Sequence, residues 1–89
     1  MAKRGKLEII KDIIEIIKFN HNSVKHTPLL RKSNLSSTRF KEYYTELLEK
    51  GFITEKINKR NRLISLTTKG ERFHEKYKTM INFIEEFDL

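Results

Sequence analysis

The sequence predicts a mainly α-helical domain with one small β-hairpin. Segments 6–19, 37–50 and 68–87 repeat apolar residues at the three- and four-residue spacing of an amphipathic helix. Two short runs after Gly51 alternate apolar and polar residues, as half-buried strands do. A length of 89 residues leaves room for only one domain.

The first helix is expected over residues 6–19, where charged side chains fill the gaps between apolar ones. Its main apolar stripe consists of Leu7, Ile10, Ile13, Ile14 and Ile17. Ile9 and Ile16 widen this face, which predicts a second packing partner. The polar segment 20–23 ends the helix, and Val24 and Lys25 form one short extended rung.

A short second helix is expected over residues 28–33. Thr27 accepts a hydrogen bond from the first free amides, and Pro28 suits the first helical position. Residues 34–36 then form a tight turn, with Ser36 as the N-cap of the third helix. That helix, 37–50, ends at Gly51. Its buried face consists of Phe40, Tyr44, Leu47 and Leu48.

Two strands, 52–57 and 63–67, are expected to form a hairpin with the polar tip 58–61. Thr68-Lys69-Gly70-Glu71 is a capping box that opens the last helix. Apolar residues follow on that helix at heptad spacing. They are Phe73, Tyr77, Met80, Ile84 and Phe87.

This order of elements is that of a helix-turn-helix followed by a basic wing. The runs Asn34-Leu35-Ser36, Leu47-Leu48-Glu49-Lys50-Gly51-Phe52-Ile53 and Leu66-Thr67-Thr68-Lys69-Gly70 resemble those of archaeal winged helix-turn-helix regulators. The chain is similar in particular to small archaeal chromatin proteins that dimerise through a C-terminal coiled-coil helix. The resemblance implies a winged helix-turn-helix DNA-binding domain, 1–67, and a C-terminal dimerisation helix, 68–89.

The charge agrees with a polyanionic partner, because the formal net charge is +7 and the pI about 9.8. We expect double-stranded DNA, with the third helix in the major groove and the wing on the backbone or in the minor groove. Arg39 lies near the flank of its helix and is a weaker candidate for reading bases. The candidate contacts are Thr27, Arg31 and Lys32; Ser37, Thr38, Arg39, Lys41, Glu42 and Thr45; and Lys56, Lys59, Arg60 and Arg62.

A homodimer is the second expectation. The early part of the last helix is expected to fold back on its own domain, and the later part to meet a partner subunit. The broad isoleucine face of the first helix is a further candidate surface. The candidate dimer residues are Ile9, Ile16, Tyr77, Met80, Ile84 and Phe87.

Other classes of function fit the sequence less well. The chain has no cysteine, so it has neither disulfides nor a Cys-ligated zinc module. No nucleophile motif, phosphate loop or histidine ligand pattern is present, so we expect no enzyme, cofactor or metal site. No apolar run suggests secretion or membrane insertion, which favours a cytoplasmic, nucleoid-associated protein. Two alternatives stay open: a winged-helix module that binds protein without DNA, and a basic N-terminus, Lys3, Arg4 and Lys6, that forms either a loose arm or a solvated end.

Overall fold

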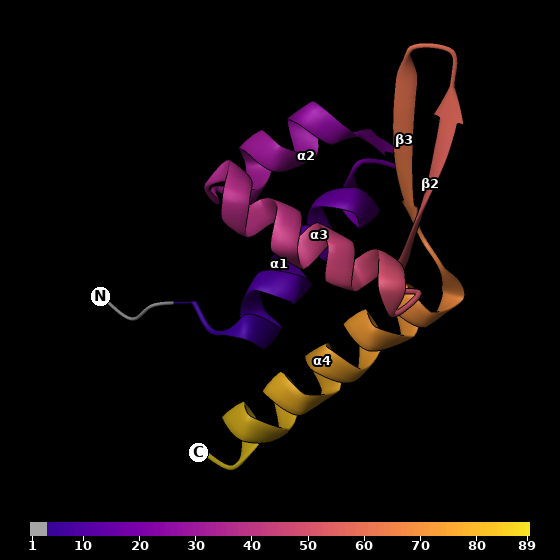
Figure 1. The fold of residues 1–89 in the computed structure, drawn as a ribbon. Coiled ribbons are helices and arrows are strands. Elements are labelled where there is room, and N and C mark those ends of the chain that lie inside the picture. Colours follow the sequence, from indigo (N-terminus) through magenta and orange to yellow (C-terminus); the bar gives the residue numbers. More distant parts are fainter. Residues whose placement is uncertain (1–3) are drawn as a thin grey trace.

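Four helices and a three-stranded antiparallel sheet form residues 4–89, the part of the chain that the computed structural model describes (Figure 1). The expected mainly helical class with a small hairpin and a long C-terminal helix is confirmed. In chain order the elements are α1 (Lys6–Phe19), β1 (Val24–Lys25), α2 (His26–Ser33), α3 (Ser37–Glu49), β2 (Ile53–Asn58), β3 (Asn61–Leu66) and α4 (Thr68–Glu86).

The hairpin of β2 and β3 projects beyond the helices (Figure 1). The strand order is β1-β3-β2, so the short β1 covers the open edge of β3 near its base. The pairs run from Ile53 opposite Leu66 to Asn58 opposite Asn61. The hairpin is therefore longer and its turn tighter than the sequence suggested, because residues 58 and 61 pair instead of forming a loop.

The core is built around α1. Its isoleucines at positions 9, 10, 13, 14 and 17 are all buried. They pack with Leu29, Phe40, Leu47 and Ile64 from α2, α3 and β3. Ile9 is only 1% exposed, so its assignment to a dimer surface is wrong. The second packing partner that its wide apolar face required lies within the same chain.

Helix ends correct the sequence analysis in two places. The second helix begins at His26, because β1 leads directly into it, and Thr27 is not its cap. The cap of α4 is Thr67, whose hydroxyl accepts a hydrogen bond from the Gly70 amide at 3.1 Å. Ser36 caps α3 as expected, accepting from the Arg39 amide at 3.2 Å.

The C-terminal helix packs against α1 through its first half. The most buried side chain of α4 is that of His74, whose Nε2 lies 2.9 Å from the Glu15 carboxylate. Further along, the predicted heptad seam divides. Its residues Phe73, Tyr77 and Ile84 are half-buried, whereas Met80 and Phe87 are exposed. Phe83, which the sequence analysis did not single out, is 55% exposed.

Candidate nucleic-acid interface

The outer face of α3 is polar and exposed. Burial of Phe40, Tyr44 and Leu47 fixes the rotation of this helix. Because α3 turns by about 100° per residue, the residues furthest from that stripe are Thr38, Glu42, Thr45 and Glu49. The exposed candidates on α3 are Ser37, Thr38, Arg39, Lys41, Glu42 and Thr45. The structure thus presents these six side chains to solvent on one element.

Charge on α3 itself is nearly balanced. The helix contains two cations, Arg39 and Lys41, and three carboxylates, Glu42, Glu46 and Glu49. The Arg39 guanidinium lies 5.9 Å from the Tyr43 ring centre, on the flank toward Lys6. The positive field of the molecule must therefore come from the neighbouring elements.

The two faces of the hairpin differ. Residues directly opposite in an antiparallel ladder share a face. Ile57 lies opposite Arg62, and Lys56 lies opposite Leu63 on the reverse face. The face of Ile57 and Arg62 continues inward as the buried residues Ile53, Ile64 and Leu66, so it is the inner face. Lys59 and Arg60 form the turn between the strands.

A carboxylate that the sequence analysis missed lies on this inner face. Glu55 accepts a hydrogen bond from the Tyr44 hydroxyl, and its Oε2 lies 3.7 Å from Nε of Arg62. Burial, followed by the neighbouring Glu55, raises the pKa of the Tyr44 phenol. Glu55 stands two residues before Ile57 in the sequence, so strand alternation was the signal that could have placed it beside Arg62.

A shallow hollow between α2 and the wing brings several candidates together. It has a volume of about 470 Å³. Its walls are Lys25, His26, Thr27, Pro28, Arg60, Asn61 and Arg62, with no carboxylate among them. Arg31 follows Thr27 by one helical turn and is exposed on the same face of α2. A phosphate backbone would meet cations on both sides of this hollow.

His26 is the titratable group inside this cationic hollow. Its ring lies edge-on to those of Phe40 and Tyr44, with centres 5.4 and 5.2 Å apart. Burial, followed by the nearby Arg62 cation, lowers the pKa of His26 below its ordinary value of 6.5.

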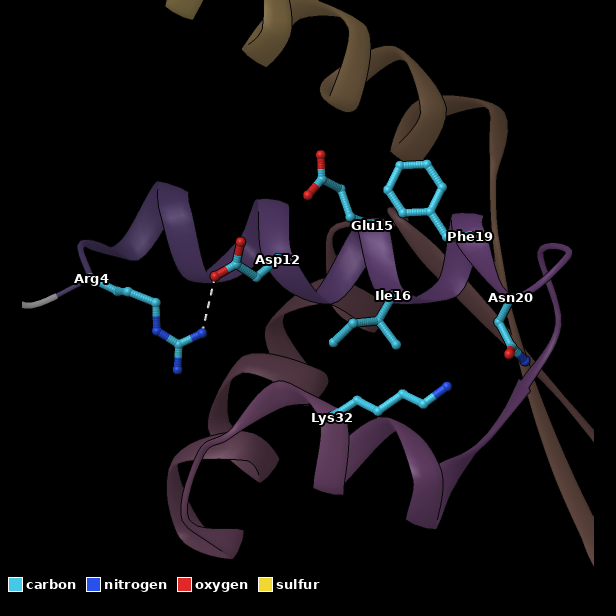
Figure 2. Close-up of a pocket in the computed structure, with 7 residues that line it drawn as sticks. All are labelled: Arg4, Asp12, Glu15, Ile16, Phe19, Asn20 and Lys32. Atoms are coloured by element: carbon cyan, nitrogen blue, oxygen red, sulfur yellow. Dashed lines mark hydrogen bonds and ion pairs between the residues drawn. The ribbon is translucent and has the colours of Figure 1, made fainter.

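Lys32 does not join the other candidates. Figure 2 shows it in a separate hollow between α1 and α2, near Ile16 and across from Asp12 and Arg4. One residue of helical rotation, about 100°, separates it from Arg31. We therefore remove Lys32 from the candidate interface.

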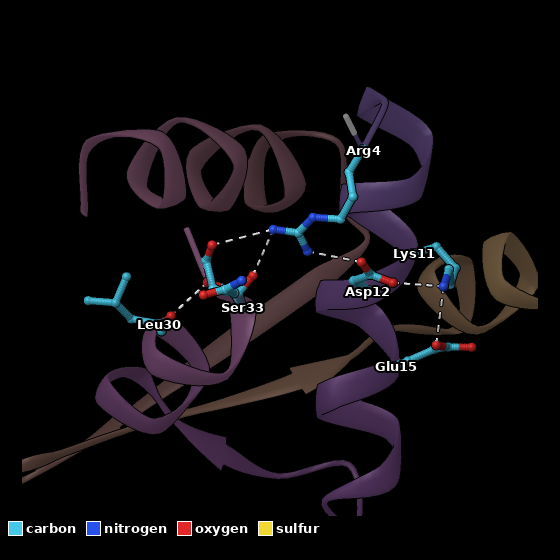
Figure 3. Close-up of polar contacts among 7 residues, drawn as sticks. Arg4, Lys11, Asp12, Glu15, Leu30 and Ser33 are labelled. Atoms are coloured by element: carbon cyan, nitrogen blue, oxygen red, sulfur yellow. Dashed lines mark hydrogen bonds and ion pairs between the residues drawn. The ribbon is translucent and has the colours of Figure 1, made fainter. Parts of the chain in front are cut away.

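Two of the basic N-terminal residues, Arg4 and Lys6, form ion pairs within the fold. Figure 3 shows the Arg4 guanidinium between α1 and the end of α2, 3.0 Å from the Asp12 carboxylate. It also donates to the backbone carbonyls of Ser33 and Asn34 at 3.1 and 3.4 Å. Lys6 pairs with Glu46 at 2.9 Å. The loose-arm alternative is thus wrong for Arg4 and Lys6, and Lys3 lies outside the described residues.

Arg4 has a structural role instead. Burial would raise the pKa of Asp12, but hydrogen bonds from Lys11 and Arg4 outweigh it and hold that pKa below its ordinary value. The ionised Asp12 thus keeps Arg4 in place against the turn between α2 and α3. This contact fixes the helix-turn-helix on α1.

Residues 3–85 match the sequence profile of the winged helix-turn-helix. The chain belongs to the winged helix-turn-helix family. The match covers almost the whole sequence and includes every element that forms the candidate interface. No curated protein gives a significant match to the sequence.

Solved structures of similar fold include three that cover most of this winged helix-turn-helix chain. Sso10a-2, a DNA-binding protein from Sulfolobus solfataricus, is 19% identical with a TM-score of 0.78, over 94% of this chain and 85% of that one. The PcaV transcriptional regulator from Streptomyces coelicolor is 15% identical with a TM-score of 0.75, over 89% of this chain and 60% of that one. F-93 of SSV1 is 21% identical with a TM-score of 0.67, over 96% and 99%. These similarities confirm the fold and its resemblance to an archaeal winged-helix protein.

Residues 4–89 contain neither a membrane-spanning helix nor a cluster of metal-binding side chains. No helix in that range is both long and apolar enough to cross a membrane. No group of three or more histidine or carboxylate side chains in the same range is placed to hold a metal ion.

Proposed function

We propose that this winged helix-turn-helix protein binds double-stranded DNA, as a transcription regulator or a chromatin-architectural protein. In this proposal α3 enters the major groove and the wing contacts the backbone or the minor groove. The observation that carries it is the cationic hollow between α2 and the wing, whose walls include no carboxylate, beside the exposed face of α3. That Sso10a-2 is a DNA-binding protein and PcaV a transcriptional regulator supports the same reading.

Most of the affinity is expected to come from elements other than α3. Three carboxylates against two cations give α3 no net attraction for phosphate. Lys59 and Arg60 at the tip, with Arg31 on α2, supply the attraction. The outermost side chains of α3, Thr38 and Thr45, are short and Glu42 is acidic, so sequence discrimination should be modest.

The homodimer is part of the same proposal. Residues 1–67 bind DNA, and 68–89 join the protomers through the exposed side chains of Met80, Phe83 and Phe87. Of the residues first considered, Tyr77 and Ile84 are half-buried on the same helix, whereas Ile16 is half-buried and lines the hollow between α1 and α2. A dimer would present two α3 helices to successive major grooves, about 34 Å apart. The proposed location is the cytoplasmic nucleoid.

The test is a fluorescence-anisotropy titration with duplex DNA at two salt concentrations, beside light scattering of the free protein. Tight binding that weakens steeply with salt is expected, because several phosphates are neutralised. The double variant Lys41→Ala/Arg60→Ala should lose most of the affinity for DNA. A folded dimer that does not bind DNA at low salt would contradict the proposal. That result would favour the alternative, a winged-helix module that binds another protein. The exposed apolar residues of α4 are the observation that supports this alternative.

A further inference from the structure

One exposed residue of the cationic wing is apolar. Ile57 is 69% exposed, near the far end of β2. It stands among Lys56, Lys59, Arg60 and Arg62, where a solvated hairpin end would carry polar side chains. Among the described residues, Ile57 is the only exposed large hydrophobic side chain on the wing.

Strand pairing fixes the direction in which Ile57 faces. It lies opposite Arg62, on the inner face that carries the buried Ile53 at the base of the hairpin. This face looks over the hollow between α2 and the wing, whose walls include Arg60 and Arg62. Ile57 is therefore on the side of the wing toward α2 and α3, whereas Lys56 is on the reverse side.

We propose that Ile57 inserts into the minor groove of the bound duplex and contacts deoxyribose carbons and base edges there. This inference rests on the proposed function and adds an apolar contact to it. Arg62 lies opposite Ile57, and Lys59 and Arg60 lie at the adjacent turn, so these cations complement the phosphate strands that border the groove. A minor groove flanked by phosphates and floored by apolar sugar atoms is the surface that matches a small apolar side chain between cations.

The decisive variant is Ile57→Thr. Threonine keeps the branched Cβ and the preference for strands, so the hairpin is retained. It replaces two carbons by a hydroxyl, and the affinity for duplex DNA should fall by roughly five- to fifteenfold. The slope of log affinity against log salt should not change, because no phosphate contact is lost. Ile57→Val, which stays apolar, should keep affinity within about threefold of the wild type.

Phe19→Thr is the matched control. Phe19 is 72% exposed, as apolar as Ile57, and lies on α1 beside the separate α1–α2 hollow. It should bind DNA as the wild type does. A second arm repeats the titration with the minor groove filled by a groove-binding dye. The dye should reduce the DNA affinity of the wild type by a larger factor than it reduces that of Ile57→Thr.

The outcomes separate this inference from the proposed function. No binding by the wild type at low salt would overturn both. Tight wild-type binding with an unaffected Ile57→Thr would overturn the apolar contact and leave the DNA-binding proposal standing. A smaller salt slope for Ile57→Thr would show that phosphate contacts were lost, which also overturns it. Wild-type binding that is indifferent to the dye would exclude the minor groove as the partner of Ile57.

Discussion

At the scale of single residues, the attraction of the candidate interface for DNA depends on which of its cations are paired with carboxylates. Within residues 4–89 no ion pair joins Lys59 or Arg60 to a carboxylate, whereas Arg62 faces Glu55. Exposed pairs of this kind contribute little to stability, about 0–1 kcal/mol. Their effect on a bound polyanion is larger, because Glu55 repels the phosphates that Arg62 attracts.

Glu55→Gln should therefore strengthen DNA binding. Glutamine keeps an oxygen that accepts the Tyr44 hydroxyl hydrogen bond and removes the negative charge beside Arg62. We expect a gain of about two- to fivefold and a steeper salt dependence, measured by anisotropy. An affinity equal to that of the wild type would mean that Arg62 does not face the DNA.

His26 gives the fold a pH dependence with a defined sign. Because its pKa is lower in the folded state than the ordinary 6.5, the unfolded chain binds the extra proton. The contribution of neutral His26 to the free energy of unfolding is fully present above about pH 6.5. It is lost as the pH falls from about 6.5 through the lower pKa of the folded state. His26→Phe keeps an aromatic ring against Phe40 and Tyr44.

The measurement is urea unfolding between pH 7.5 and 5. The loss of stability on acidification should be smaller in His26→Phe than in the wild type. Identical pH profiles for the two proteins would show that His26 does not carry this dependence.

At the scale of elements, rotation about a helix axis assigns each side chain to a surface. Arg31 and Lys32 are adjacent in sequence, but Arg31 lies on the outer face with Thr27 and Lys32 lies toward α1. The same rotation puts Ile9 in the core and leaves Phe83 exposed on α4.

Arg31→Ala and Lys32→Ala form a matched pair, each removing one cation from α2. Arg31→Ala should weaken DNA binding by roughly three- to tenfold and reduce the salt slope by about one per protomer. Lys32→Ala should change both by much less. Equal effects of the two substitutions in the anisotropy titration would refute the division of α2 into two faces.

The approach of α4 to the wing depends on a glycine. A Cβ at Gly70 would lie 2.1 Å from the Phe52 backbone oxygen, so the first turn of α4 or the start of β2 must move. Gly70→Ala is expected to destabilise the fold by about 1–3 kcal/mol, measured as a lower melting temperature. At Gly5 an added Cβ meets nothing within 4 Å, so Gly5→Ala is the control. A melting temperature unchanged by Gly70→Ala would show that the contact relaxes freely.

At the scale of the whole molecule, the candidate DNA contacts and the candidate dimer surface lie on different elements. The molecule measures 50 × 29 × 22 Å, with α4 extending away from the wing (Figure 1). Arg60 and Arg62 lie on the hairpin, and Met80, Phe83 and Phe87 lie on the second half of α4. In the proposed function, this separation would let one surface bind DNA while the other binds a second protomer.

Phe83→Glu should convert a dimer to a monomer, because two carboxylates would have to be buried in the interface. We expect half the mass by light scattering and a loss of DNA affinity of at least about tenfold, since the two wings no longer act together. Phe19→Glu, at another exposed phenylalanine, should stay dimeric. If Phe83→Glu stays dimeric with unchanged affinity, the dimer surface lies elsewhere.

Local signals determined most of the fold. The isoleucine periodicity of α1, the Ser36 cap and the left-handed Gly51, with φ of 77°, each depend on neighbours within a few residues. Such features follow from backbone sterics and helix capping, so the sequence alone predicted the elements, their order and the winged helix-turn-helix. It also placed cations correctly on the wing, because a hairpin tip is exposed wherever the hairpin packs.

Only the tertiary structure decided which surface each side chain joins. Contacts between elements bury Ile9 in the core and place Lys32 in the hollow between α1 and α2. Contacts of the same kind pair Arg4 with Asp12 and Glu55 with Arg62. Periodicity gives the face of one helix or strand, but it does not give the element that this face meets. That choice follows from how α1, α2 and the hairpin pack around one shared core, which no short segment specifies.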